Sequence, residues 1–192
     1  MTTDIVILAA GKGTRMQSAL PKVLHPLAGR PMLAHVLAAA DSVANANKIV
    51  VTGHGAAQVE SAVADTGSIF AQQTEQLGTA HAVQMAVPHL RAEAKVLILY
   101  GDVPLISPTT IDQMLTAVTD TTISLLTIEL VNPMGYGRIV RNSQGEIESI
   151  VEQKDASSEQ LNINEINTGV MALGAGQLLD WLPQINNNNA QQ

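Results

Sequence analysis

Basic residues and glycines gather in the stretch LAAGKGTRM, from Leu8 to Met16. Lys12 and Arg15 lie within it, Lys22 follows it, and no carboxylate stands between Gly11 and Lys22. Glycines let the backbone approach a ligand closely, and the N–H groups of a strand-to-helix turn can point at an anion. The pattern therefore favours a phosphate-binding loop over a tight turn with solvated basic side chains.

The same loop departs from two common phosphate-binding patterns. The dinucleotide fingerprint needs a third glycine where this chain has Met16, and the Walker loop needs a Gly-Lys-Ser/Thr run that is absent. The next apolar run, KIVVTGHG, also ends without the acidic residue that binds a ribose in dinucleotide folds. A dehydrogenase and a P-loop hydrolase are both disfavoured.

A single carboxylate, Asp102, follows the apolar run KVLILYG. A carboxylate at the end of a buried strand is costly unless it has a partner. A divalent cation held by one or two carboxylates and by phosphate oxygens is one such partner, and a cap on the turn before Pro104 is the alternative. The residue alone supports both interpretations equally, and the basic loop makes the metal interpretation the better one.

Two further polar groups could contact a nucleoside or a sugar. Amides that could read a base edge, and a glycine and threonine that open a helix, occur in QQTEQLGTAHA: Gln72, Gln73, Gln76, Gly78 and Thr79. A glycine, a carboxylate and an amide suited to sugar hydroxyls occur in GYGRI, VEQKD and EINTG: Gly137, Glu152 and Asn167. On the residues alone, a polar loop with a helix cap and ordinary strand-end polarity explain these groups better.

The elements that must position these residues alternate between strands and helices. Apolar runs predict strands within residues 4–10, 48–53, 68–72, 95–102 and 121–130, and helical patterns fill residues 32–43, 56–66, 79–90 and 107–119. The alternation predicts an α/β fold, a Rossmann-like, mostly parallel sheet with helices on both faces. After Asn132 a β-hairpin region, a further strand and a helix are added. Thr79 is expected to cap its helix, and Ser107 with Pro108 the following one.

Composition restricts the class of protein. The chain has 192 residues, 46% of them hydrophobic and 2% aromatic, with a formal net charge of -7 and no cysteine. An acidic chain of this kind is not expected to bind nucleic acid, and no run reaches membrane-spanning length. The N-terminal run lacks a basic flank and ends in glycine, which is typical of a strand rather than a signal peptide. We expect a cytoplasmic protein without membrane or nucleic-acid partners.

Seven motifs, taken in order, carry a resemblance to a known family. LAAGKGTRM followed by PK at Pro21 and Lys22 resembles the signature of the sugar-1-phosphate nucleotidyltransferases. With EQLGTAHA, YGDVPL, GYGRI, VEQKDA and EINTG, the chain from about Ile5 onward resembles the uridyltransferase half of the bacterial bifunctional N-acetylglucosamine-1-phosphate uridyltransferase/glucosamine-1-phosphate acetyltransferases. The resemblance implies a nucleotide-diphospho-sugar transferase fold. It also implies Mg²⁺-dependent reaction of UTP with N-acetylglucosamine 1-phosphate, giving UDP-N-acetylglucosamine, a precursor of peptidoglycan and lipopolysaccharide, and pyrophosphate.

The resemblance also implies residue roles. The nucleotide contacts it implies are Leu8, Ala9, Ala10, Gly11, Lys22, Gln73, Gly78 and Thr79. The sugar contacts it implies are Tyr100, Gly101, Asp102, Gly137, Glu152 and Asn167. Lys22 and Arg15 would neutralise phosphate charge and Asp102 would ligate Mg²⁺, which makes these three the predicted catalytic residues. The alternative is a nucleotidyltransferase that uses another base or sugar, and only the details of EQLGTAHA and EINTG argue against it.

The extent of the family's domains sets further expectations. By the resemblance, residues 1–192 form one nucleotidyltransferase domain that is incomplete at its C-terminus, because the family's domain continues beyond NNNNAQQ to an Asn that is the second metal ligand. The family's C-terminal β-helix, which carries the acetyltransferase and drives formation of a homotrimer, has no counterpart here. The chain is therefore expected to be monomeric, and either an enzyme or a fragment that only binds nucleotide.

Overall fold

The computed structural model describes residues 2–13 and 16–185, and the chain divides into two compact units. The first unit contains residues up to Ser124 together with Met171–Gln184, and the second contains Leu125–Val170. Within the described ranges the α-helices are α1 (Met32–Ala40), α2 (Ala56–Ala62), α3 (Thr79–Ala86), α4 (Pro108–Ala117) and α5 (Ala175–Trp181). Short 3-10 helices are η2 (Lys22–Leu24), η3 (Ala64–Thr66), η4 (Val87–His89), η5 (Gln160–Asn162) and η6 (Leu182–Gln184).

The sheet of the first unit has the strand order β5-β4-β1-β6, followed by the last residues of β10. Its strands are β1 (Thr3–Ala9), β4 (Asn47–Thr52), β5 (Ile69–Gln72), β6 (Lys95–Tyr100) and β10 (Glu165–Gly174). The pairs β1–β4, β1–β6 and β4–β5 are parallel, and β10 is antiparallel to β6. The predicted mostly parallel sheet is confirmed. Its central strands are apolar because both faces are covered.

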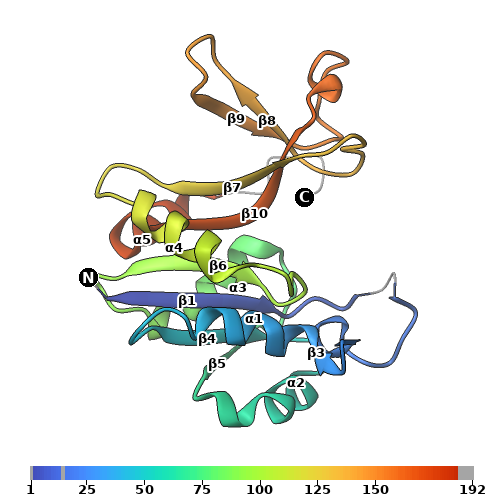
Figure 1. The fold of residues 1–192 in the computed structure, drawn as a ribbon, viewed down its shortest axis with the longest axis vertical. Coiled ribbons are helices and arrows are strands. Elements are labelled where there is room, and N and C mark those ends of the chain that lie inside the picture. Colours follow the sequence, from blue (N-terminus) through green and yellow to red (C-terminus); the bar gives the residue numbers. More distant parts are fainter. Residues whose placement is uncertain (1, 14–15, 186–192) are drawn as a thin grey trace. The chain divides into compact units, whose positions relative to one another are not determined.

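Helices cover both faces of this sheet, as predicted. Alternate side chains of β1, Val6 and Leu8, pack in one core cluster with residues of α3 and α5. The intervening Ile5 and Ile7 are also fully buried, on the opposite face. Figure 1 shows α1 in front of the sheet and α3 behind it, and α1 also contacts α4. A small hairpin of β2 (Pro26–Leu27) and β3 (Arg30–Pro31) precedes α1.

The two expected helix caps have different outcomes. Ser107 caps α4 as predicted, because its side chain accepts a hydrogen bond from Thr110 N at 3.0 Å. Thr79 was the wrong choice for α3, whose N-cap is Gly78 with φ +101° and no side-chain cap. Glycine adopts this left-handed backbone without the strain that a Cβ would add. Among the residues the structure describes, no helix is both long and apolar enough to cross a membrane.

The second unit is the predicted β-hairpin region. Strands β8 (Arg138–Arg141) and β9 (Ile147–Val151) form an antiparallel hairpin, and β10 pairs with both β8 and β7 (Ser124–Glu129). The turn is fixed by Asn142, whose Oδ1 accepts hydrogen bonds from Gln144 N at 3.0 Å and Glu146 N at 2.9 Å. Gly145 completes the turn with φ +84°.

Candidate functional site

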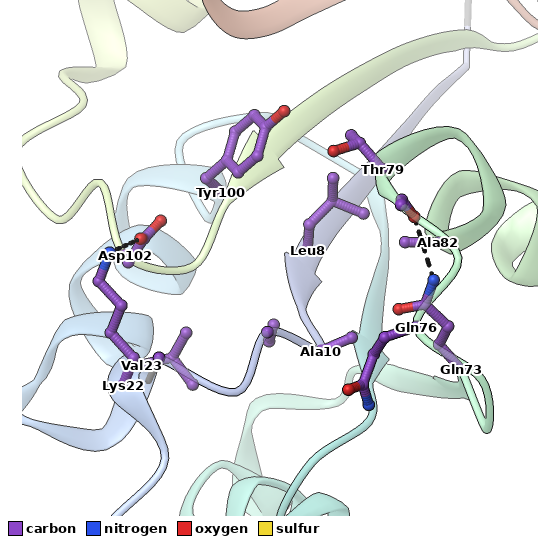
Figure 2. A pocket seen from close by; sticks show the side chains of 14 residues that line it. Leu8, Ala10, Lys22, Val23, Gln73, Gln76, Thr79, Ala82, Tyr100 and Asp102 are labelled. Carbon is purple, nitrogen blue, oxygen red and sulfur yellow. Dashed lines mark hydrogen bonds and ion pairs between the residues drawn. The ribbon is translucent and has the colours of Figure 1, made fainter. Parts of the chain in front are cut away.

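A pocket of about 380 Å³ opens where β1 and β6 end, at the carboxyl edge of the parallel sheet (Figure 2). Ligands of open α/β sheets bind at this edge. Most of the residues predicted for nucleotide, phosphate and metal contacts line it: Leu8, Ala9, Ala10, Gly11, Lys22, Gln73, Gly78, Thr79 and Asp102. The structure thus gathers positions that are up to about ninety residues apart in sequence.

The glycine-bearing loop after β1 is shaped by contact with Lys22. Gly13 has φ +58°, and a Cβ placed on it would lie 2.7 Å from Lys22 Cβ. Any side chain at this position would have to displace the lysine backbone or the loop. Gly11 lines the same pocket, and a Cβ on it would meet nothing within 4 Å. Arg15, predicted to hold phosphate, lies outside the described residues.

A glycine outside the loop, Gly53, packs against Ala10 of the loop. It follows β4, and a Cβ on it would lie 2.8 Å from Ala10 Cβ and 2.9 Å from Ala10 O. The next residue, His54, donates its backbone N–H to Ala10 O at 3.3 Å. This contact was not predicted from the sequence. Its signal was a glycine directly after a buried strand, which often marks a close backbone approach.

Lys22 and Asp102 form an ion pair at the rim of the pocket, with Nζ 2.5 Å from Oδ2 (Figure 2). Lys22 opens η2 after Pro21, and Asp102 follows β6. Their side chains are 37% and 27% exposed, and the structure shows no second partner for either among the described residues. Partly exposed pairs of this kind contribute little to stability, so each group is free to exchange its partner for an incoming charge.

The other end of the pocket is polar but uncharged. Gln73 is 3% exposed, and its Nε2 lies 3.1 Å from Gly78 O and 3.1 Å from His81 Nδ1. Gln76, whose amide was noted in the sequence but not predicted as a contact, also lines the pocket. Val23 and Ala82, which also line it, were missed, because nothing in an apolar residue type distinguishes a pocket wall from a core position.

Tyr100 and Gly101, predicted sugar contacts, lie at the end of β6. Tyr100 lines the pocket. Gly101 packs inward: its N–H donates to Leu8 O at 2.9 Å, and a Cβ on it would lie 3.1 Å from Val23 Cγ1 and 3.2 Å from Leu33 Cδ1. A side chain here would press on both residues, so the glycine permits the close packing of this strand end on η2 and α1. Its contact with a sugar stays a prediction.

The three later candidates lie together in the second unit. Asn167 N donates to Gly137 O at 2.9 Å, and a Cβ on Gly137 would lie 3.1 Å from Glu152 Oε1. Asn167 Oδ1 accepts from Gly169 N at 2.9 Å. Gly137, which directly precedes β8, thus lies beside both Asn167 of β10 and Glu152 after β9, and an amide together with a carboxylate is suited to hydroxyl groups.

A charged pair stiffens the same unit. Arg141 Nε and Nη2 donate to the two carboxylate oxygens of Glu165 at 2.8 and 2.7 Å. This side-chain hydrogen bond lowers the pKa of Glu165 to about 2. The same bond raises the pKa of Arg141.

Among the described residues, no group of three or more His, Asp or Glu gathers that could form a preformed metal site. Asp102 is the only carboxylate among the described residues that line the pocket. Mg²⁺ commonly keeps several waters and takes one or two carboxylates together with substrate phosphates. Asp102 fits an ion that arrives with a polyphosphate better than a preformed protein cage.

Comparison with known proteins gives a consistent result. A family model described as MobA-like NTP transferase domain matches residues 5–157. "Bifunctional protein GlmU" of Cellvibrio japonicus is 56% identical over 98% of this chain, and the chain spans 42% of the length of that relative. Two solved structures share the fold at low identity. A UDP-glucose pyrophosphorylase complexed with UDP-glucose has a TM-score of 0.71 at 18% identity, covering 98% of this chain and 83% of its own. A CMP:2-keto-3-deoxy-manno-octonic acid synthetase complexed with CTP has a TM-score of 0.73 at 20% identity, covering 100% and 81%.

Proposed function

The chain belongs to the family of MobA-like NTP transferase domains, and we propose that it transfers a uridylyl group from UTP to N-acetylglucosamine 1-phosphate. The products would be UDP-N-acetylglucosamine and pyrophosphate. The resemblance of its motifs to the uridyltransferase half of the bifunctional family and its similarity to GlmU of Cellvibrio japonicus support the choice of base and sugar. The nucleotidyltransferase character follows from the family itself.

One observation carries the proposal: the pocket has two chemically different ends. A glycine loop, Lys22 and Asp102 lie at one end, and the amides of Gln73 and Gln76 lie at the other. Charges and backbone N–H groups suit a triphosphate, and amides suit a base edge. A volume of about 380 Å³ is within the range of small-molecule pockets.

The residues favour catalysis by positioning rather than by a general base. A phosphate monoester has a second pKa of about 6, so the sugar phosphate is already mostly ionised at neutral pH. Its oxygen forms a bond to the α-phosphorus of UTP while the bond from that phosphorus to the bridging oxygen breaks, and pyrophosphate leaves with the electron pair. Lys22 stabilises charge at the α-phosphate, and the N–H groups of the loop hold the leaving group.

Asp102 is the residue that would hold a divalent ion, and Mg²⁺ is the ion that the resemblance implies. When bound, the ion supplies positive charge against the phosphate oxygens. Asp102 pairs with Lys22 through Oδ2, so Oδ1 has capacity for a cation, and the charge of that cation would weaken the hold of Asp102 on the lysine. The released Lys22 is then available to the nucleotide.

We assign Gly137, Glu152 and Asn167 to the sugar. Their proximity within the second unit supports a shared ligand, and the resemblance supplies its identity. Replacing Asn167 by alanine is expected to raise the KM for the sugar phosphate and leave the Kd of UTP unchanged.

Pyrophosphate release tests the proposal. All four nucleoside triphosphates should be crossed with glucose 1-phosphate and N-acetylglucosamine 1-phosphate, with and without Mg²⁺. The expected result is Mg²⁺-dependent release with UTP and N-acetylglucosamine 1-phosphate that Lys22→Ala abolishes. Release of pyrophosphate with a different nucleotide and sugar phosphate would replace UTP and N-acetylglucosamine 1-phosphate as the assigned substrates. UTP binding without release from any pair would contradict transfer by this chain.

A further inference from the structure

The amide of Gln73 is fixed from two sides. Its Nε2 lies 3.1 Å from the backbone oxygen of Gly78 and 3.1 Å from Nδ1 of His81, a partly buried residue in the first turn of α3. Its own backbone N–H donates to Thr52 O at 2.7 Å, which anchors the residue beside the end of β4. A side chain that is 3% exposed and held in this way has little freedom to turn.

These contacts determine which way the amide faces. A carbonyl oxygen only accepts hydrogen bonds, so the atom that faces Gly78 O must be the nitrogen of Gln73. The amide nitrogen carries two hydrogens, and His81 Nδ1 takes the second as an acceptor. A neutral imidazole with its proton on Nε2 satisfies this arrangement. Both hydrogens are therefore used inside the protein.

The oxygen of the same amide is left for the pocket. Gln73 lines the pocket, and Figure 2 shows its nitrogen on the dashed hydrogen bond and its oxygen turned to the side of Ala10, another pocket residue. No group among the described residues is seen to donate a hydrogen bond to Oε1. The site thus presents a hydrogen-bond acceptor at the position where a base edge would lie.

Base chemistry makes this orientation selective. Uracil carries an N3–H donor that can meet an acceptor, whereas N3 of cytosine is itself an acceptor and would face Gln73 Oε1 without a hydrogen. A reversed amide would offer N–H instead and favour cytosine. Gly78 O and His81 Nδ1 are the two groups that prevent the reversal.

We infer that His81 is a positioning residue for base selection: it accepts the second hydrogen of the Gln73 amide and so keeps the amide oxygen turned toward the nucleotide. The inference rests on the proposed function for the identity of the nucleotide. It adds a residue that touches no substrate and acts through Gln73.

Three variants separate this role from a general effect on the fold. His81→Ala removes the acceptor, whereas His81→Asn places an amide oxygen near the position of Nδ1 and should restore it. His89→Ala, in η4 after the same helix, removes a histidine that does not line the pocket that contains Gln73. The melting temperature of each variant checks that the fold is intact.

The experiment measures the Kd of UTP and of CTP by calorimetric titration, alongside pyrophosphate release. Losing one hydrogen bond is expected to lower the preference for UTP over CTP by about 2- to 12-fold in His81→Ala. His81→Asn and His89→Ala should keep the wild-type preference. An unchanged preference in His81→Ala, or a loss that His81→Asn fails to restore while folding normally, would overturn the role of His81.

The two readouts keep the inference distinct from the proposed function. A wild-type chain that prefers UTP but releases no pyrophosphate contradicts transfer, and the His81 comparison still decides the inference through binding. A wild-type chain that releases pyrophosphate without distinguishing UTP from CTP overturns the inference and leaves transfer standing.

Discussion

Two aspartates at opposite ends of the neighbouring strands β1 and β6 have very different surroundings. Asp4, near the start of β1, is 0% exposed, and its carboxylate accepts hydrogen bonds from Arg91 N at 2.6 Å and Arg91 Nε at 2.7 Å. A third nitrogen of the same arginine, Nη2, lies 2.6 Å from Asp4 Oδ1. Asp102, after β6, is 27% exposed and contacts a single lysine.

The difference separates a structural carboxylate from one available for binding. A buried carboxylate is tolerated when its lone pairs are occupied, and Asp4 meets this condition through one arginine. Asp102 keeps unused acceptor capacity and stays open to the pocket. The ion pairs Asp4–Arg91 and Asp102–Lys22 are of similar length but serve different purposes. The number of hydrogen bonds to the carboxylate and its exposure distinguish them better than the distance between the charges does.

The largest effect that can test this contrast concerns Asp4. Arg91→Met leaves the fully buried Asp4 carboxylate without a cation and should lower the free energy of unfolding by about 3–5 kcal/mol, measured by urea titration. Lys48→Met is the matched control, because the carboxylate that it leaves unpaired, Asp41, is 60% exposed and stays solvated. Surface pairs contribute about 0–1 kcal/mol. Equal losses in both variants would contradict the contrast.

Lys22→Ala should show the opposite profile. Turnover is expected to fall about 10²–10³-fold, since a placed charge that stabilises a transition state is removed. The free energy of unfolding should change by less than about 1 kcal/mol, because the pair is partly exposed. Steady-state kinetics and urea titration on the same preparation measure the two effects. Near-normal turnover would sink the assignment of Lys22.

Glycines offer the same contrast with smaller effects. Gly53→Ala forces a Cβ to within 2.8 Å of Ala10 Cβ, and overpacking of this kind costs about 1–3 kcal/mol of unfolding free energy. Gly11→Ala adds a Cβ into open space, so its stability should be unchanged. The added methyl group projects from the pocket loop and should weaken UTP binding. Thermal unfolding and UTP titration of both variants check the pair, and similar destabilisation in both would contradict it.

The smallest effect concerns the pair of Glu165 and Arg141, which is intermediate in exposure. The pKa of Glu165 is lowered from 4.5 to about 2, so the folded state favours the charged carboxylate. The stabilisation is fully present above about pH 4.5 and is lost as the pH falls toward 2. The melting temperature of wild type should exceed that of Glu165→Gln above this window, and the gap should close within it. A gap that stays constant down to pH 2.5 would contradict this origin.

Much of this arrangement could be predicted from the sequence because the signals were local. Continuous apolar runs defined β1, β4 and β6, and the carboxyl-edge rule then placed the loop after β1 beside Asp102. The hairpin of the second unit followed from the turn residues between its strands.

Other features depend on contacts that a linear pattern does not contain. The ion pair of Lys22 with Asp102, the packing of Gly53 on Ala10 and the bond between Gln73 and His81 each join residues that only the fold brings together. His81 in particular has the sequence signature of an ordinary helical histidine. Its partner decides its role.

The central position of β1 also affects how the chain is made. The ribosome completes this apolar strand first, yet the strands that cover its two edges are β4 and β6. At about 5–20 residues per second, the roughly 90 residues from Ala9 to Tyr100 take roughly 5–20 s to synthesise. Throughout that interval β1 has an unpaired edge. Slow codons between β4 and β6 should therefore increase the nascent chain's need for chaperones.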